Sequence, residues 1–437
     1  MGARVAVLPV QAVSLAVSTY LTIRTVGTTS FATVGLLIGL GSLFAFLNLG
    51  TSAAVSNAAG ESRVIHDRRL FPVLVSATRA TIVAGALTTA IALGVAFLGL
   101  WPRLLGAGNA SLLTVGAVTV IASVCLLQPL GQGATILMAT GRTVTATLAA
   151  AATSVTMLAL VGAAAILHAS AIFFVIAPFG AQLIVAAVTC VVAGNAINIQ
   201  ARDLLSATIN PNYNGARIGH EARPTLVMWI LLPLAYQTDR LLLNHLSTAS
   251  QLASYNIASQ FYMALFSIVA AGSAAMWGHF SHARASNELP DVPDFVRLTV
   301  GFAAFGTLLA VGYLLFTPWL SRLVSGGAIS VSFWLALPFG ILLIAQAAHQ
   351  PSAMVQTDAP GLRFNACAVA VMTILNLTLG VLLTPALGAP GPVLASAISL
   401  PLALALPSFL RARHVLGHNG EALGLGIPLR RTAVRRG

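Results

Sequence analysis

Residues 111 to 137 read SLLTVGAVTVIASVCLLQPLGQGATIL, a stretch without one charged side chain. A bilayer core about 30 Å thick requires about 20 apolar residues in a helix, so this stretch is long enough to cross a membrane. Comparable apolar runs lie on both sides of it. They fall at roughly 5–23, 31–57, 71–99, 144–167, 170–194, 224–246, 251–277, 296–316, 329–355, 364–384 and 391–410. The sequence therefore predicts an all-α integral membrane protein of about twelve transmembrane helices.

The composition excludes a water-soluble fold. Hydrophobic residues make up 57% of the 437 positions, charged residues make up 7%, and the mean hydropathy is +0.91. Soluble domains carry about 25% charged residues. Backbone polar groups inside lipid must be paired within their own segment, and the alternating pattern of a membrane barrel is absent, so we expect helices.

The basic residues predict the topology of the chain. All 22 are arginines, and most lie at the two termini or in loops that follow even-numbered predicted helices. The opposite loops carry Arg24, Arg103 and Arg322. Because positively charged loops stay in the cytoplasm, we expect a multi-pass protein of the cell membrane with both termini cytoplasmic. This placement explains the net charge of +12 without nucleic acid, which we do not expect as a partner.

An internal duplication divides the predicted helices into six and six. At an offset of 221 residues, Arg63 aligns with Arg284 and Arg142 with Arg363. Six helices return the chain to its starting side, so the halves are expected to be parallel repeats around a central cavity. We expect an N-terminal six-helix lobe over 1–200, a cytoplasmic linker over 201–222, a C-terminal six-helix lobe over 223–410 and a basic cytoplasmic tail over 411–437.

The residues typical of a catalytic centre are missing from the pattern. Nine of the ten acids fall in predicted cytoplasmic loops or the tail, and no two histidines stand at a ligand spacing within a predicted helix. Cys125, Cys190 and Cys367 are far apart in apolar runs, as small core residues are. We therefore expect no enzyme activity, no metal and no cofactor.

Ionisable residues within the predicted spans are the first candidates for function. Arg79 lies inside the third span, Asp239 and Arg240 lie in the seventh, and Arg24 closes the first. Placing such a group in the membrane costs about 2.5–3.5 kcal/mol or more, so each needs a reason. One interpretation is a cationic cavity in which guanidinium groups bind phosphate oxygens and Asp239 orients an arginine or takes a proton. In the alternative, Arg79 extends to the membrane surface and Asp239 neutralises an arginine of a neighbouring helix.

Polar residues in the second predicted span form a stripe on one helix face. Asn48, Ser52 and Ser56 are spaced four apart, and Asn57 follows directly. Hydrogen bonding between neighbouring helices is the alternative explanation. The candidate substrate-binding residues are Arg24, Arg79, Asp239, Arg240, Asn48 and Asn57.

Three segments resemble a known group of exporters. They are GSLFAFLNLGTSAAVSNAAGESR (41–63), QTDRLLLNHLSTASQLASYNIA (237–258) and NLTLGVLLTPALGAPG (376–391). In their order and spacing these are similar to the polysaccharide and O-antigen flippase branch of the multidrug/oligosaccharidyl-lipid/polysaccharide exporter superfamily. The chain departs from that pattern at Pro390 and Pro392 and in having no lysine.

The resemblance implies a function and partners. A protein of that branch flips a polyprenyl-pyrophosphate-linked oligosaccharide to the outer leaflet for the assembly of surface polysaccharide such as lipopolysaccharide. The sugar head would lie in a cationic cavity, with Arg24, Arg79 and Arg240 as contacts and Asp239 at the Asp-Arg position. Lipid-linked oligosaccharide, membrane lipids and polysaccharide-assembly proteins are the implied partners.

Other functions stay open at this stage. A multidrug or cation antiporter of the related extrusion branch needs buried acids, of which Asp239 is the one candidate in a predicted span. The peptidoglycan-precursor flippase branch typically carries two more C-terminal helices, for which no apolar run remains after residue 410. A membrane glycosyltransferase or polymerase is disfavoured by the lack of acids in the predicted outer loops, and a scaffold without transport activity is also compatible.

Overall fold

The computed structural model describes residues 2–61, 69–106, 108–216, 219–285, 291–357 and 359–417. Nearly all of these residues are helical, and no strand occurs among them. Ten helices in this part of the chain are long and apolar enough to cross a membrane. The prediction of an all-α, multi-pass membrane protein is therefore confirmed.

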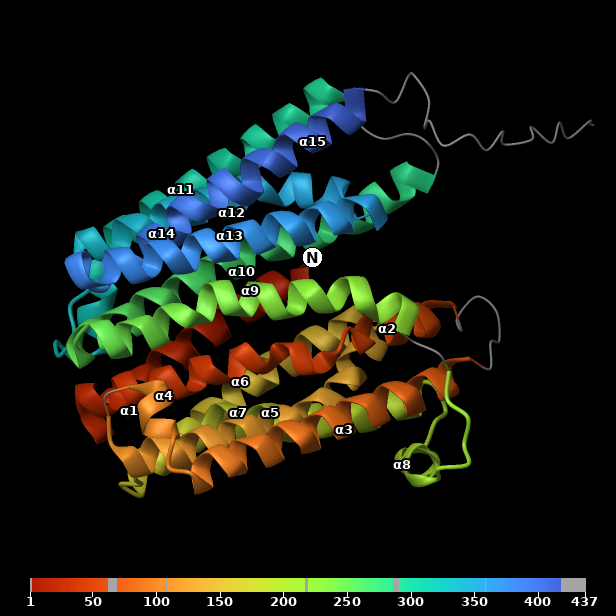
Figure 1. Cartoon of the computed structure of the whole chain (residues 1–437), viewed down its shortest axis with the longest axis horizontal. Helices are drawn as coiled ribbons and strands as arrows, with labels where there is room; N and C mark the ends of the chain where they lie inside the picture. Colours follow the sequence, from red (N-terminus) through yellow and green to blue (C-terminus); the bar gives the residue numbers. More distant parts are fainter. Residues whose placement is uncertain are drawn as a thin grey trace, which may run out of the picture.

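The first half of the chain folds into six membrane-length rods. Helix α1 (Gly2–Leu43) is two helical segments, because Gly27 between them has φ 81° and ψ 167°. Glycine reaches such a conformation without a steric penalty, and the chain reverses direction there (Figure 1). The second segment continues through the 3₁₀ turn η1 (Phe44–Asn48) into α2 (Thr51–Glu61). The remaining helices are α3 (Leu70–Phe97), the short α4 (Trp101–Leu105), α5 (Ala110–Ala139), α6 (Thr143–Ile166) and α7 (Ala171–Ala196).

The second half repeats this arrangement after the short helix α8 (Ala201–Ile209). Its helices are α9 (Gly219–Leu246), α10 (Ala249–Ala285), α11 (Val292–Val324), α12 (Phe333–Val355), α13 (Ala359–Leu387) and α14 (Pro390–Leu400). A π-helical turn, η2 (Pro401–Ala405), joins α14 to α15 (Leu406–Gly417), which completes the last rod. Helix α9 is not among the ten candidate spans because the side chains of residues 219–229 lie outside the described part of the chain, but its 28 residues match the other rods in length. Together with the two segments of α1, it brings the rods to twelve.

One pair of equivalent helix ends matches the predicted offset: Ile166 and Leu387, which end α6 and α13, are 221 residues apart. Helix α8 lies within the predicted linker, and α15 extends seven residues into the predicted tail. Residues 418–437 lie outside the described part of the chain.

The two lobes are close at one end of the molecule and diverge towards the other. In Figure 1, α9 lies between the lobes, with α3, α5 and α8 on one side and α11, α14 and α15 on the other. The second segment of α1 packs on α9 and α10, and η1 and α2 also pack on α9. We call the end where the lobes meet the α4 end, and the opposite end the α8 end.

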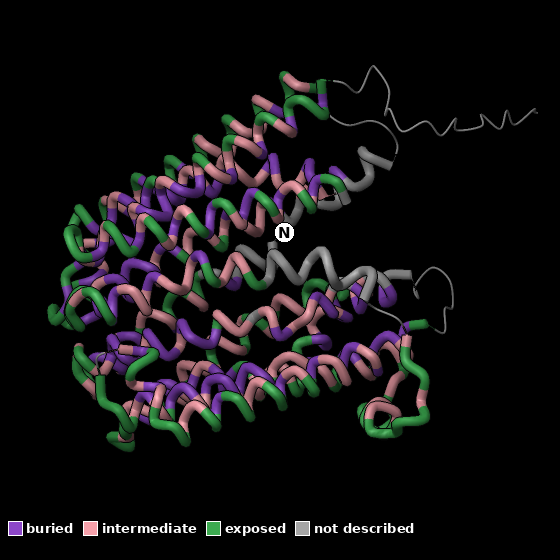
Figure 2. Tube along the Cα trace, viewed as in Figure 1, coloured by how far each residue is buried: buried purple, intermediate pink, exposed green. Residues whose placement is uncertain are grey.

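Burial follows the packing expected inside a membrane. Purple, buried stretches face neighbouring helices, whereas green, exposed stretches lie on the outward faces of the bundle (Figure 2). Apolar side chains such as Phe97, Ile166 and Leu308 are largely exposed, as befits a surface that contacts lipid tails. Within the lobes, small residues allow helices to approach closely. A Cβ at Gly133 would lie 2.7 Å from the Cα of Cys190, so glycine permits the contact between α5 and α7.

Candidate functional site

A polar cluster lies where α9 and α10 face the N-terminal lobe. We call it the junction cluster, and it comprises Gln237, Asp239, Arg240, Tyr255, Asn256 and Ser259. Helices α9 and α10 form an antiparallel hairpin with its turn at residues 247–248, so residues at equal distance from the turn lie opposite each other. The hairpin therefore brings an Asp-Arg pair on α9 against a Tyr-Asn pair on α10.

Arg240 is held by side chains of its own hairpin. Its Nε donates to Oδ1 of Asn256 at 3.0 Å, and its Nη2 donates to Oγ of Ser259 at 3.2 Å. Nη1 donates to Oε1 of Gln237, one turn earlier on α9. The guanidinium carbon also lies 5.6 Å from the centroid of the Tyr255 ring, within the range of a cation–π interaction. These contacts keep a charged group at the boundary between lobes.

Asp239 is a carboxylate buried next to that arginine. It is 5% exposed and accepts a hydrogen bond from the Tyr255 hydroxyl at 3.0 Å. Within the part of the chain that the structure describes, its carboxylate forms no ion pair, even with Arg240. An acid placed in the membrane with one hydrogen bond is a candidate to bind a proton or another cation.

The cluster contacts the N-terminal lobe through two glycines of α1. A Cβ at Gly39 would lie 2.6 Å from Cδ of Arg240, and one at Gly35 would lie 2.2 Å from Nδ2 of Asn256. The same Nδ2 donates to the carbonyl of Ala32 at 3.3 Å. A larger side chain at either glycine would displace the side chain of Arg240 or Asn256, so the two glycines make room for the junction cluster against α1.

Further hydrogen bonds join the lobes near the α4 end. Nδ2 of Asn244 donates to the carbonyl of Leu105 at 2.6 Å, and Nε2 of His245 lies 3.3 Å from the carbonyl of Arg103. Beside the junction cluster, next to Ser259, Oγ1 of Thr19 on the first segment of α1 donates to Oε1 of Gln260 at 2.9 Å. The contacts therefore extend from the junction cluster to the turn that carries α4.

The structure brings two of the six predicted site residues together. Asp239 and Arg240 lie in the junction cluster, as described above. Arg24 is in the last turn before Gly27, where its Nη1 donates to the Tyr20 hydroxyl at 3.1 Å. It is exposed and does not contact the junction cluster.

Arg79 does not belong to the junction cluster. It lies on α3, beside α8. Its guanidinium donates to the carbonyls of Ala207 at 2.6 Å, Thr208 at 2.8 Å and Tyr213 at 2.8 Å, and also to that of Asn210. These carbonyls belong to the end of α8 and the following turn. A cation at the C-terminus of a helix is favourable because the last carbonyls lack helical partners. The structure therefore places Arg79 where it holds α8 against α3.

The two asparagines of the second predicted span have separate positions. Asn48 ends η1, and its Oδ1 accepts a hydrogen bond from the backbone N–H of Ser52 at 3.2 Å, at the start of α2. This is local capping of a helix N-terminus. Asn57 lies on α2, but its side chain is outside the described part of the chain.

Sequence reasoning missed Tyr255 and Asn256 as members of the cluster. Both belong to a segment already quoted for its resemblance, yet neither is ionisable near neutral pH, and polar residues are frequent in helix interfaces. A usable signal existed in the hairpin: Asp239 and Tyr255 are 16 residues apart, and so are Arg240 and Asn256. Both spacings are centred on the turn at residues 247–248.

Comparisons with known proteins identify the fold. No family model matches the sequence, and neither does any curated protein. Among solved structures, the chain is similar to an inward-facing multidrug resistance MATE family transporter of the MOP superfamily, with a TM-score of 0.73 and 14% identity over 96% of this chain and 99% of that one. The chain has the fold of MOP superfamily transporters.

Two further solved structures are also similar to the chain. Lipid II flippase MurJ, in an inward closed conformation, gives a TM-score of 0.60 at 12% identity over 92% of this chain and 90% of that one. A MOP superfamily transporter from Pyrococcus furiosus, described as having a binding pocket of reversed polarity, gives 0.63 at 16% identity over 96% of both chains. At such identities the similarity shows the MOP-type fold and leaves the substrate open.

Proposed function

We propose that this chain is a transporter that exposes a site between its lobes alternately to the two sides of the membrane. The observation that carries the proposal is the set of hydrogen bonds across the lobes, which lie from the junction cluster to the α4 end, while the lobes diverge towards the α8 end (Figure 1). Transporters built from two parallel repeats work by rocking one lobe against the other.

The contacts across the lobes have the strength that a gate requires. Hydrogen bonds such as those of Asn244 and Asn256 contribute about 1 kcal/mol each to the closed arrangement. A ligand that prefers the open arrangement by a few kcal/mol can therefore reverse the population. Opening the lobes at the α4 end would separate Arg240 from Gly39 and expose the guanidinium to the space between the lobes.

The proposed substrate is a lipid-linked oligosaccharide, attached through pyrophosphate to a polyprenyl carrier. Arg240 supplies the positive charge at the boundary, and guanidinium binds phosphate oxygens in pairs. The similarity to a lipid II flippase supports a substrate of this class. Flipping would move the head group to the outer leaflet for surface polysaccharide assembly, and polysaccharide-assembly proteins would be partners.

The proposed orientation places the α8 end in the cytoplasm. The described turns and helices at that end carry Arg69, Arg142 and Arg202, which the positive-inside rule assigns to the cytoplasmic side of the cell membrane. Both termini would then be cytoplasmic. The structure would correspond to an inward-facing state, in keeping with TM-scores of 0.73 and 0.64 for inward- and outward-facing MATE structures.

A multidrug or cation antiporter is the second candidate function. The buried Asp239, which accepts a hydrogen bond from Tyr255, favours this alternative, because such transporters bind cations at buried acids. In the flippase proposal the same carboxylate would bind the coupling ion. Export of polysaccharide and efflux of a cationic dye, measured on the same variants, separate the two functions.

The deciding experiment is complementation of a strain that lacks its polysaccharide flippase. We expect the wild-type chain to restore export and Arg240→Ala to reduce it at least ~10-fold, with Arg240→Lys between them. Arg322→Ala is the matched control, since Arg322 is an exposed arginine at the α4 end whose Nε lies 3.5 Å from Oγ of Ser330. Failure of the wild type to restore export, together with proton-dependent efflux of the dye, would assign the chain to the antiporters.

A further inference from the structure

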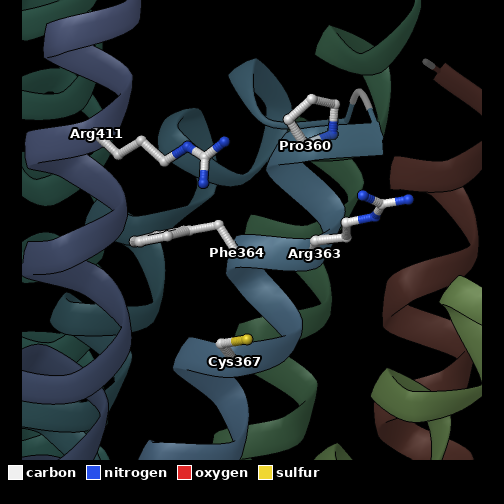
Figure 3. Close-up of a pocket in the computed structure, with 5 residues that line it drawn as sticks. All are labelled: Pro360, Arg363, Phe364, Cys367 and Arg411. Atoms are coloured by element: carbon white, nitrogen blue, oxygen red, sulfur yellow. The ribbon is translucent and has the colours of Figure 1, made fainter.

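A pocket opens between α13 and α15, in the C-terminal lobe and apart from the junction cluster. It has a volume of about 450 Å³ and is lined by Pro360, Arg363, Phe364, Cys367 and Arg411 (Figure 3). Ligand pockets fall in the range of about 300–1,000 Å³, so this one can hold a small polar head group. It lies near the start of α13 and the last turns of α15, which places it at the α8 end of the molecule.

Two arginines give the pocket a positive charge. The guanidinium carbon of Arg411 lies 4.6 Å from the centroid of the Phe364 ring, so a cation–π contact fixes this side chain across the gap between the helices. Figure 3 shows Arg411 extending towards α13 and the Phe364 ring, while the guanidinium of Arg363 extends away from Arg411, on the other side of α13. Among the described residues, neither guanidinium forms an ion pair with a carboxylate. The pocket is therefore cationic and ready to accept an anion.

Apolar surface continues from the pocket towards the middle of the membrane. On α13, the exposed face that carries Arg363 continues with Cys367, Val371 and Ile374, spaced three or four residues apart on one side of the helix. On the last rod, Leu402, Leu406 and Leu410 are also exposed, on the face next to that of Arg411. A charged pocket between helices with exposed apolar side chains matches a molecule with a charged head and hydrocarbon tails.

We propose that this pocket binds the phosphate of an anionic phospholipid from the surrounding leaflet. Arg411 contacts the phosphate oxygens through charge-assisted hydrogen bonds, Arg363 adds positive charge beside the pocket, and the acyl chains lie along the exposed faces of α13 and of η2 and α15. A soluble anion would leave these apolar walls uncovered. The bound lipid joins α13 to α15 at the end of the lobe that opens, and this role is independent of which substrate the transporter carries.

Native mass spectrometry of the detergent-solubilised full chain tests the proposal, with phosphatidylglycerol as the probe. We expect one phosphatidylglycerol to be retained by the wild type and affinity to fall at least ~10-fold in Arg363→Ala/Arg411→Ala. Arg413→Ala is the matched control, because Arg413 is an exposed arginine of the same helix that does not line the pocket. Retention by Arg413→Ala at the wild-type level supports the site, whereas an equal loss in both variants assigns the effect to general charge and overturns it.

Two further binding measurements test the proposal even if the double variant folds poorly. Cys367→Trp keeps both arginines and fills the pocket, so it should lose phosphatidylglycerol while eluting as the wild type does in size exclusion. Phosphatidylcholine, whose choline carries a positive charge, should bind more weakly than phosphatidylglycerol. Displacement of the lipid by millimolar inorganic phosphate would assign the pocket to a soluble anion, and unchanged lipid retention in Cys367→Trp would place the lipid elsewhere. Either result overturns the proposal.

Discussion

Arg240 at the lobe junction and Arg79 beside α8 are both guanidinium groups on long apolar helices, but their partners differ. Arg79 donates to backbone carbonyls of residues 207–213, which stay at the end of α8 as long as α8 is folded. Arg240 donates to the side chains of Gln237, Asn256 and Ser259, next to glycines of the other lobe. Side chains can exchange partners when the lobes move, whereas carbonyls at a helix end remain in place.

The difference shows what a charge in a membrane helix indicates. Placing a charged side chain in the membrane costs free energy, and the contacts that offset this cost can serve a structural or a functional role. Backbone carbonyls within one lobe indicate a structural role, as for Arg79. Side-chain partners at a boundary between moving parts indicate a functional role, as for Arg240.

The largest effect is expected when each of the two arginines is replaced by alanine and transport by the two variants is compared. Arg240→Ala should lower substrate transport at least ~10-fold, because a hydrogen bond between a guanidinium and a charged group of the substrate contributes about 1.5–3 kcal/mol. Arg79→Ala should leave transport within about twofold of wild type at equal protein levels. Export in the complemented strain measures both. Equal losses in the two variants would remove the distinction.

Arg79→Ala should instead act on local stability. Loss of hydrogen bonds to carbonyls of Ala207, Thr208 and Tyr213 is expected to cost about 2–3 kcal/mol in the docking of α8 on α3. Hydrogen exchange of residues 201–213 measures this change, and Arg202→Ala, on an exposed part of α8, is the control. Wild-type protection of α8 in Arg79→Ala would contradict the structural role.

Gly39→Ala is expected to weaken closure of the lobes by about 1–3 kcal/mol, because the new Cβ would overlap Cδ of Arg240. Gly94→Ala is the control, since a Cβ at Gly94 has no atom within 4 Å. Accessibility of a cysteine introduced at Ala32 to a water-soluble maleimide should rise in Gly39→Ala and stay unchanged in Gly94→Ala. Equal accessibility in the two variants would show that α1 and α9 do not close at this position.

Asn244→Ala should have the smallest effect, about 1 kcal/mol on the closed arrangement, because it removes the hydrogen bond to the carbonyl of Leu105. Thr119→Ala is the control, as the hydroxyl of Thr119 bonds the carbonyl of Val115 within its own helix. Transport rates should change by less than about tenfold in Asn244→Ala. A complete loss of transport would mean that Asn244 contacts the substrate or is required for folding.

Much of the fold follows from hydrophobic run length, because each crossing must satisfy its own backbone in lipid. The apolar run 31–57 did not reveal the break at Leu49, whose φ of 52° ends η1 before α2 begins. The predicted end of the last span at residue 410 also fell short, since α15 continues to Gly417. Arginines at the end of a rod are compatible with a helix that leaves the hydrocarbon core.

The candidate site was less predictable than the fold. Asp239 and Arg240 could be singled out because charges are rare in spans, but the same criterion also selected Arg79, whose partners come from a segment 128 or more residues away. Asn48 was singled out as part of a polar stripe and caps α2 locally. A charge in an apolar span can be recognised from the sequence. Whether its role is structural or functional depends on contacts with distant segments, which the sequence does not reveal.

The distance between the lobes at the α4 end tests the central claim most directly. Nitroxide labels at Leu104→Cys on α4 and Trp334→Cys on α12, both exposed positions at this end, can be placed in a chain whose three native cysteines are replaced. Pulsed electron resonance should show one short distance in the substrate-free protein and a second, longer distance when substrate is added. One unchanged distance in both conditions, in protein shown to transport, would contradict a gate at the lobe junction.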